Sequence, residues 1–236
     1  MGLYLSIIAV CILAISAIVA PVFEVNFFIV LALVSAATVI IIIVDALVAT
    51  VCRLLPAKCA NHESKIYTVS AKEKSFYEKL KIRKWKDKIP EIGHFTGFRK
   101  NKIAEPKSVE YLDRFLLEAC YGELGHFFIL FIGFAILLFF PLFPRPSLWF
   151  AISIPVSLIN VLLNVPTIFT LRYNSYKLEV LRKSNLKKQK RAAEKKILEA
   201  AAVASADGEA LQNSAAIKTL VKSEELLQGE AEKKNA

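Results

Sequence analysis

The stretch EACYGELGHFFILFIGFAILLFFPLFP, residues 118–144, decides the fold class of this chain. It begins with two carboxylates and a histidine, and it carries no charge from Phe127 to Pro144. An uncharged run of this length can cross the hydrocarbon core of a bilayer as a helix. At about 100° per residue, His126 falls between Glu118 and Glu123 within an arc of roughly 140°. Because ionised groups are costly in hydrocarbon, we expect this polar face to look into the protein or into a hydrated cleft.

Long apolar runs extend beyond this stretch, and 55% of the 236 residues are hydrophobic. Residues 3–23 and 27–51 form two candidate spans, 125–143 a third and 147–171 a fourth. We expect a retained first helix rather than a signal peptide, because no Lys or Arg precedes it. The predicted fold class is all-α, a polytopic membrane protein with about four transmembrane helices, a cytoplasmic amphipathic and basic loop, and a basic C-terminal helix.

The predicted spans divide the chain into four parts. These are a transmembrane hairpin at 1–52, a cytoplasmic basic loop with an interfacial helix at 53–117, a second transmembrane pair carrying the expected site at 118–172, and a basic helix with a weakly structured tail at 173–236. The tail is rich in Ala, Glu, Lys, Asn and Ser and offers no large side chains for a core.

Positive charge is segregated along the chain, whose formal net charge is +10. All Lys and Arg residues except Arg145 lie in 53–114 or 172–234, and the first of these blocks holds 16 Lys/Arg against 8 Asp/Glu. Basic loops stay on the cytoplasmic side, so we expect a multi-pass protein of the cell membrane with both termini cytoplasmic. No nucleic-acid recognition motif accompanies the charge, so we expect contact with membrane lipids and no nucleic-acid partner.

The four cysteines, at positions 11, 52, 59 and 120, show no CxxC or other metal-binding spacing. We therefore expect neither a disulfide framework nor a metal site. Cys52 and Cys59 flank a membrane boundary, where palmitoylation is the alternative to unmodified thiols.

The basic loop contains two segments suited to the membrane surface. Residues 72–82 place Phe76, Tyr77, Leu80 and Ile82 among Lys and Glu, which predicts a short helix with its aromatic side on the membrane. In residues 81–93, Trp85 stands among alternating Lys, Arg and Asp residues, and the basic residues around it could receive phosphate or carboxylate groups. The alternative is a juxtamembrane basic anchor.

Polar residues also interrupt the predicted spans. Asp45 lies near the end of the second, where it is either a member of the site or a solvated group at the helix end. Asn160 and Asn164 lie one turn apart in the fourth, between Pro155 and Pro166, which we expect to kink the helix. Such asparagines act either as interhelical hydrogen-bond partners or as members of a site.

The sequence contains three blocks in this order: IRKWKDKIPEIG at 82–93, ExxxxELxH at 118–126 and NVPTIFTLRYN at 164–174. Together, over roughly residues 40–182, they resemble the glycosyl-4,4'-diaponeurosporenoate acyltransferase family of bacterial membrane proteins. The resemblance implies transfer of a fatty acyl group to a sugar hydroxyl of a glycosylated carotenoid, with no cofactor beyond an acyl donor such as acyl-CoA. The residues that match by position are Arg83, Lys84, Trp85, Lys86, Glu118, Glu123, His126, Asn164, Pro166, Arg172, Tyr173 and Asn174.

Acyl transfer to a hydroxyl requires a base for the alcohol and groups that hold the donor. His126 is the natural base, and Glu118 or Glu123 would orient its ring. Arg172, Arg83 and Lys86 would bind a phosphate-bearing donor or polarise its carbonyl. No Ser or Cys stands in a recognisable nucleophile setting, which favours direct transfer. The rival interpretations are a non-enzymatic membrane scaffold with a polar inter-helix network and a small membrane methyltransferase or reductase.

Overall fold

The computed structural model describes residues 2–89, 103–142 and 144–206. All regular secondary structure in these ranges is helical, which confirms the all-α fold class. The end of the first sequence block, residues 90–93, and the tail from 207 to 236 lie outside the described residues.

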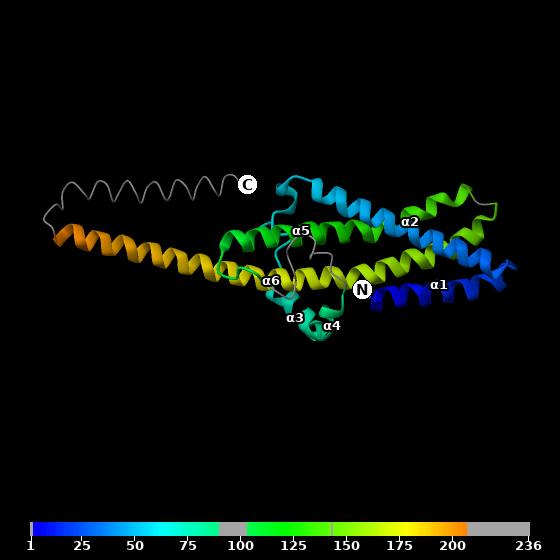
Figure 1. Ribbon diagram of the computed structural model, residues 1–236, viewed down its shortest axis with the longest axis horizontal. Coiled ribbons are helices and arrows are strands. Elements are labelled where there is room, and N and C mark those ends of the chain that lie inside the picture. The colour runs from blue at the N-terminus through cyan, green and yellow to red at the C-terminus, as the bar shows by residue number, and fades with distance from the viewer. Residues whose placement is uncertain (1, 90–102, 143, 207–236) are drawn as a thin grey trace. The chain divides into compact units, whose positions relative to one another are not determined.

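Four helical segments are long and apolar enough to cross a membrane, as predicted. The first two are α1 (Gly2–Val22) and α2 (Phe27–Leu54), joined by a tight turn (Figure 1). The Asn26 side chain caps α2 by accepting the Phe28 N–H at 2.8 Å. The third is Val109–Leu142, composed of α5 (Val109–Ile132) and the 3-10 helix η4 (Gly133–Leu142), and the fourth lies in α6 (Pro146–Ala206).

Short helices connect α2 to the rest of the chain. They are η1 (Ala57–Ala60), α3 (Ala71–Lys79), α4 (Ile82–Trp85) and η2 (Lys86–Lys88). The side chain of Ser70 accepts the Glu73 N–H at 3.1 Å and so fixes the start of α3. Lys81 adopts the left-handed conformation, with φ of 55°, and separates α3 from α4.

Two helix boundaries differ from the sequence-based expectation. Helix α5 begins at Val109, so Glu118 lies in about its third turn rather than at its start. Helix α6 continues as one α-helix through Pro155 and Pro166 and onward through the basic segment 181–200. Neither Pro nor Gly occurs between Arg172 and Ala206, so the sequence supplies no residue that would end the helix there.

The chain forms two compact units, one of residues 1–104 and 114–177 and the other of residues 105–113 and 178–236. Within the second unit, Arg182 pairs with Asp113, and the Asn185 side-chain amide donates to the carbonyl of Pro106 at 2.7 Å. The candidate site described below lies entirely in the first unit.

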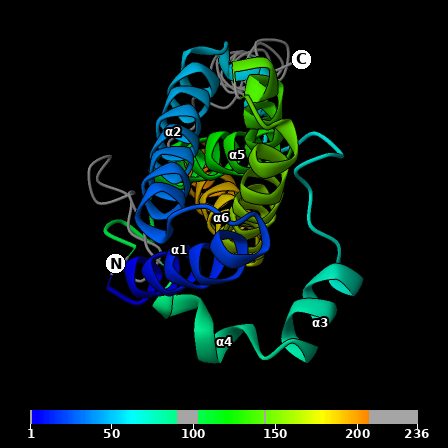
Figure 2. The same ribbon diagram turned by 90° about the vertical axis from the view of Figure 1, so that its right-hand side faces the viewer.

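The core of the first unit is formed where α1, α2, η4 and the apolar part of α6 meet, as Figure 2 shows from the end of these helices. Val30, Val34 and Ile152 are fully buried there. The indole of Trp149 on α6 donates to the carbonyl of Ile136 in η4 at 3.1 Å, which satisfies a polar group inside this apolar core.

The segment predicted to lie on the membrane packs on α6 with part of its aromatic side. Tyr77 and Ile82 are buried against Tyr173, whereas Phe76 and Leu80 remain exposed. The Tyr77 hydroxyl donates to Glu73 at 2.5 Å, so this packing buries the ring without leaving its hydroxyl unpaired.

Candidate active site

Helices α5 and α6 run antiparallel and bring the second and third sequence blocks together. Gly122 lies against Leu171, His126 contacts Asn164, and Gly133 lies against Asn160. The residue number rises along α5 as it falls along α6, which is the pattern of antiparallel neighbours. Residues eight positions apart on α6, such as Asn164 and Arg172, are about 12 Å apart along the helix axis. The site therefore has two levels.

At the first level, a chain of three hydrogen bonds leads from His126 on α5 to Asp45 on α2. The Nδ1 atom of His126 lies 2.6 Å from Oδ1 of Asn164. The Asn164 amide nitrogen is 2.9 Å from Oδ1 of Asn160, whose own amide nitrogen is 3.3 Å from Oδ1 of Asp45. Both asparagines are buried.

The Asn164 amide decides which atom donates in the hydrogen bond between His126 and Asn164. The Asn164 amide nitrogen also lies 2.9 Å from the backbone carbonyl of Asn160, which can only accept. The oxygen of Asn164 must therefore face His126, so Nδ1 carries the proton and donates it. In the neutral ring Nε2 is then the unprotonated nitrogen, which is the form that a general base requires.

Gly133 leaves space for the Asn160 side chain, which belongs to this series of hydrogen bonds. A Cβ atom at position 133 would lie 2.8 Å from the amide nitrogen of Asn160, closer than real Cβ contacts. The carbonyl of Gly133 accepts a hydrogen bond from Ser157 at 3.1 Å, which holds the two helices together at this point. An alanine at position 133 would therefore have to displace the Asn160 amide.

At the second level, Arg172 joins three segments of the chain. Its Nε and Nη2 atoms donate to the two carboxylate oxygens of Glu73, the second at 3.0 Å, and Nη1 donates to Glu123. Nη1 also donates to the carbonyl of Ile66 at 3.0 Å. This bidentate geometry tethers α3 and α5 to α6.

The carboxylate of Glu73 is shaped by its contacts with Arg172 and Tyr77. Partial burial acts to raise its pKa, but hydrogen bonds from Arg172 and Tyr77 outweigh burial and hold the pKa below its ordinary value. Burial and the hydrogen bond to this carboxylate raise the pKa of the Tyr77 hydroxyl. Glu73 therefore stays ionised at neutral pH.

The first sequence block reaches the third through two direct contacts. Arg83 Nε donates to the hydroxyl of the fully buried Tyr173 at 2.8 Å, and the Lys86 ammonium lies 3.4 Å from the side-chain oxygen of Asn174. The Trp85 indole donates to the carbonyl of Leu80 at 3.0 Å. Lys84 is exposed. The loop thus presents cations beside the end of the apolar part of α6.

The two glutamates predicted to orient His126 are engaged by arginines instead. Glu123 pairs with Arg172, and Glu118 lies 3.7 Å from Arg53. The structure places Asn164 at the Nδ1 atom of the histidine, so the expectation of a glutamate partner is corrected. An amide can orient the His126 imidazole within an apolar span without burying the charge that a carboxylate partner would bring.

No sequence pattern predicts Glu73 as a partner of Arg172 or links Asp45 with the two asparagines. The only signal for Glu73 was its spacing from Ser70, which predicts a helix start and says nothing about an arginine 99 positions away. The intramembrane polar residues were visible, but linking them requires knowing that α2 and α6 are neighbours. The described residues contain no group of three or more His, Cys, Asp or Glu side chains that could hold a metal ion.

The family model for glycosyl-4,4'-diaponeurosporenoate acyltransferase matches residues 62–184, just over half of the chain. The chain belongs to this family. The match confirms the resemblance carried by the three sequence blocks, and the family's name describes an acyltransferase. No curated protein and no solved structure matches the chain. The matched residues include His126, Asn160, Asn164 and Arg172, whereas Asp45 and the helices α1 and α2 lie outside them.

Proposed function

We propose that this protein is an integral membrane acyltransferase that moves a fatty acyl group onto a sugar hydroxyl of a lipid-like acceptor, such as a glycosylated carotenoid. One observation carries the proposal. Within the residues matched by the family model, His126 donates from Nδ1 to Asn164 and so holds Nε2 in the basic form.

The proposed reaction is a direct transfer from a thioester donor of the acyl-CoA type. The acceptor oxygen attacks the acyl carbon while Nε2 of His126 takes the hydroxyl proton. The carbon–sulfur bond then breaks, and the imidazolium returns the proton to the leaving thiolate. One ester bond forms and one thioester bond breaks, with no oxidation or reduction.

The cations of the loop suit the phosphates of such a donor. Arg83 and Lys84 are exposed, and Lys86 and Trp85 are half-buried beside them. Guanidinium and ammonium groups bind phosphate through charge-assisted hydrogen bonds. Tyr173 and Asn174 support Arg83 and Lys86 from α6. In this proposal the acyl donor is a co-substrate and there is no separate cofactor.

The glutamates act in this proposal through the arginines that they bind. Arg172 is committed to Glu73, Glu123 and a backbone carbonyl, so it is a positioning residue for the loop rather than a ligand for substrate. Glu118 holds Arg53 at the end of α2. The proposed localisation is the cell membrane, with membrane lipids as neighbours and both termini on the cytoplasmic side.

The test is an acyl-transfer assay on the purified protein in detergent. Removing a general base typically lowers the rate by roughly 10²- to 10⁴-fold, so His126→Ala should lose transfer while accumulating at the wild-type level. The matched control is His62→Ala, which removes a histidine from the segment after η1 and should keep the wild-type rate. Transfer by His126→Ala at a near wild-type rate would show that the histidine is not the base.

One observation favours the alternative, a non-enzymatic membrane scaffold. The network of Arg172, Glu73 and Glu123 is paired internally, as in a purely structural inter-helix contact. The scaffold predicts that cell lipids are unchanged when the site residues are replaced. Mass spectrometry of lipid extracts separates the two, since the acyltransferase predicts loss of a species that carries one additional acyl group.

A further inference from the structure

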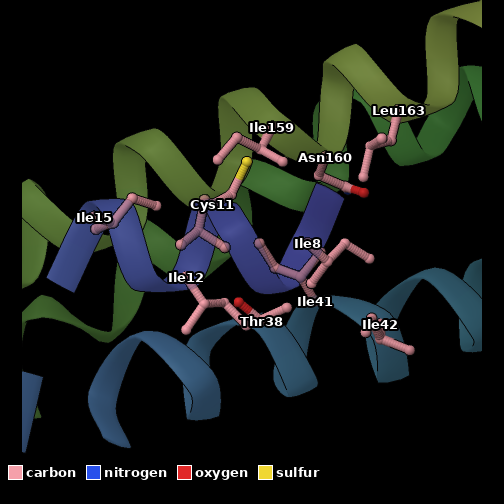
Figure 3. Close-up of a pocket in the computed structure, with 11 residues that line it drawn as sticks. Ile8, Cys11, Ile12, Ile15, Thr38, Ile41, Ile42, Ile159, Asn160 and Leu163 are labelled. Carbon is pink, nitrogen blue, oxygen red and sulfur yellow. The ribbon is translucent and has the colours of Figure 1, made fainter. Parts of the chain in front are cut away.

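An apolar groove lies between α1, α2 and α6 in the first unit (Figure 3). Its cavity volume is about 50 Å³. Eight aliphatic side chains dominate the lining, and the other three residues are Cys11, Thr38 and Asn160.

The groove follows the helix axes, and its lining residues are more buried at one end than at the other. On α1 it runs from Ile8 to Ile15, seven residues or about 10 Å, and on α6 from Leu163 to Val156. Ile8 is half-buried, whereas Ile15 and Val156 are buried at 9% and 6% exposure. The groove is therefore more open near Leu163 and closed near Val156.

The open end is linked to the proposed base through two asparagines. Asn160 lines the groove there, as Figure 3 shows, and its side-chain oxygen accepts from Asn164, the residue that holds His126. The position of the histidine partner is thus one helical turn from the groove. From that level the groove leads along α6 away from Arg172 and the cationic loop.

The lining offers hydrocarbon contacts and little else. The Thr38 hydroxyl donates to the carbonyl of Val34 in its own helix at 2.8 Å, and the amide of Asn160 is engaged by Asn164 and Asp45. A sugar or a headgroup in this groove would lose its hydrogen bonds to water without replacement. Because the surrounding helices are apolar enough to span a membrane, an alkyl chain is the chemistry that fits.

We propose that this groove seats the tail of the acyl group being transferred, with the carbonyl at the level of His126 and the methyl end toward Ile15 and Val156. The inference rests on the proposed function. It adds the part of the molecule that determines which acyl-chain lengths are accepted. Two of the three walls come from α1 and α2, outside the residues matched by the family model. Chain-length preference is therefore set by the N-terminal hairpin.

The experiment offers the purified full-length protein an equimolar mixture of acyl-CoA donors of different chain lengths, with a glycosylated carotenoid as acceptor. Ile15→Phe fills the closed end and should shift the ratio of short to long acyl products by about tenfold or more, the usual effect of changing a hydrophobic pocket by one or more methylenes. The matched control is Ile18→Phe on the same helix, where the side chain is 66% exposed, and its product ratio should equal that of wild type.

Ile12→Ala provides a second variant that does not depend on tolerating a larger side chain. It enlarges the groove and should shift the products toward longer chains. Active variants with the wild-type product ratio would overturn the groove assignment and leave the proposed function intact. A uniform rise in KM for the carotenoid at every chain length would also overturn it, because the groove would then seat the acceptor. A wild-type protein that transfers no acyl group would overturn the proposed function itself.

Discussion

At the scale of single residues, the choice of Asn164 as the partner of His126 fits the low dielectric of an apolar span. A carboxylate beside the ring would have to be desolvated, whereas an amide accepts from Nδ1 at a much smaller cost. The hydrogen bonds of the two amides then end at Asp45, so two asparagine side chains separate this acid from His126, the proposed base. The charged pairs of the site are instead gathered around Arg172, at the second level.

The pair of Glu73 and Arg172 predicts a pH-dependent stability. Because the pKa of Glu73 is below its ordinary value in the folded protein, its contribution is fully present above the ordinary carboxyl pKa and is lost as pH falls through the folded value. The two side chains are 26% and 17% exposed, so we expect Glu73→Gln to cost on the order of 2 kcal/mol at pH 7. Thermal unfolding in detergent, followed by circular dichroism, measures the effect.

The matched control for this prediction is Glu78→Gln on the same helix, whose exposed partner is Arg83. Its thermal midpoint should fall less than that of Glu73→Gln at pH 7. The difference between wild type and Glu73→Gln should shrink in acid. A difference that stays constant from pH 7 down to pH 3 would contradict the assignment of the ion pair.

At the scale of helices, three glycines of the third span, two in α5 and one at the start of η4, set how closely this span approaches its neighbours. Gly122 faces Leu171, Gly125 approaches the backbone of Ala49 on α2, and Gly133 lies against Asn160. Small residues allow helix backbones to approach closely inside a membrane. At Gly125 an added Cβ would meet ordinary contact distances of 3.7 Å and above, whereas at Gly133 the 2.8 Å contact leaves no room.

Gly133→Ala is therefore predicted to displace Asn160 from the hydrogen-bond chain. A displacement of about 1 Å at a catalytic group can cost about 10²-fold in rate, which is the loss we expect in the acyl-transfer assay. Gly125→Ala, the same substitution in the same span, should remain close to the wild-type rate. In an Asn160→Ala background the Gly133→Ala change should add little, because the clashing amide is gone. An additive loss would show that the glycine acts elsewhere.

The positions of the four spans could be predicted from the sequence, whereas the side-chain contacts between the helices could not. Uninterrupted apolar runs identify the four spans because length and hydropathy alone decide whether a helix can cross a bilayer. The end of α6 was harder to place, since the basic segment is as good a helix former as the span before it. Which partners His126 and Arg172 choose depends on the packing of α5 and α6, and no local pattern encodes it.

At the scale of the whole molecule, the features of the proposed site are shared unequally between the residues matched by the family model and the N-terminal hairpin. The matched residues hold the proposed base, its amide partner and the cationic loop, while the N-terminal hairpin supplies Asp45 and two walls of the apolar groove. This division predicts a common reaction within the family with chain-length preference set by α1 and α2. It also requires that the loop and the site lie on the side of the membrane where the acyl donor is found.

The segregation of basic residues predicts that side. Residues 53–114 hold 16 of the 31 Lys and Arg residues, whereas the connector between the third and fourth spans holds only Arg145, so the loop and the C-terminal segment should both be cytoplasmic. Single cysteines at exposed positions Lys58, Arg145 and Lys196, in a protein whose native cysteines are replaced, test this with a membrane-impermeant maleimide. We expect Arg145→Cys to react in intact cells, and Lys58→Cys and Lys196→Cys to react only after the membrane is opened. In a four-span protein one crossing separates Lys58 from Arg145, and two crossings separate Lys58 from Lys196. Equal labelling of positions 58 and 145 in intact cells would therefore refute four spans.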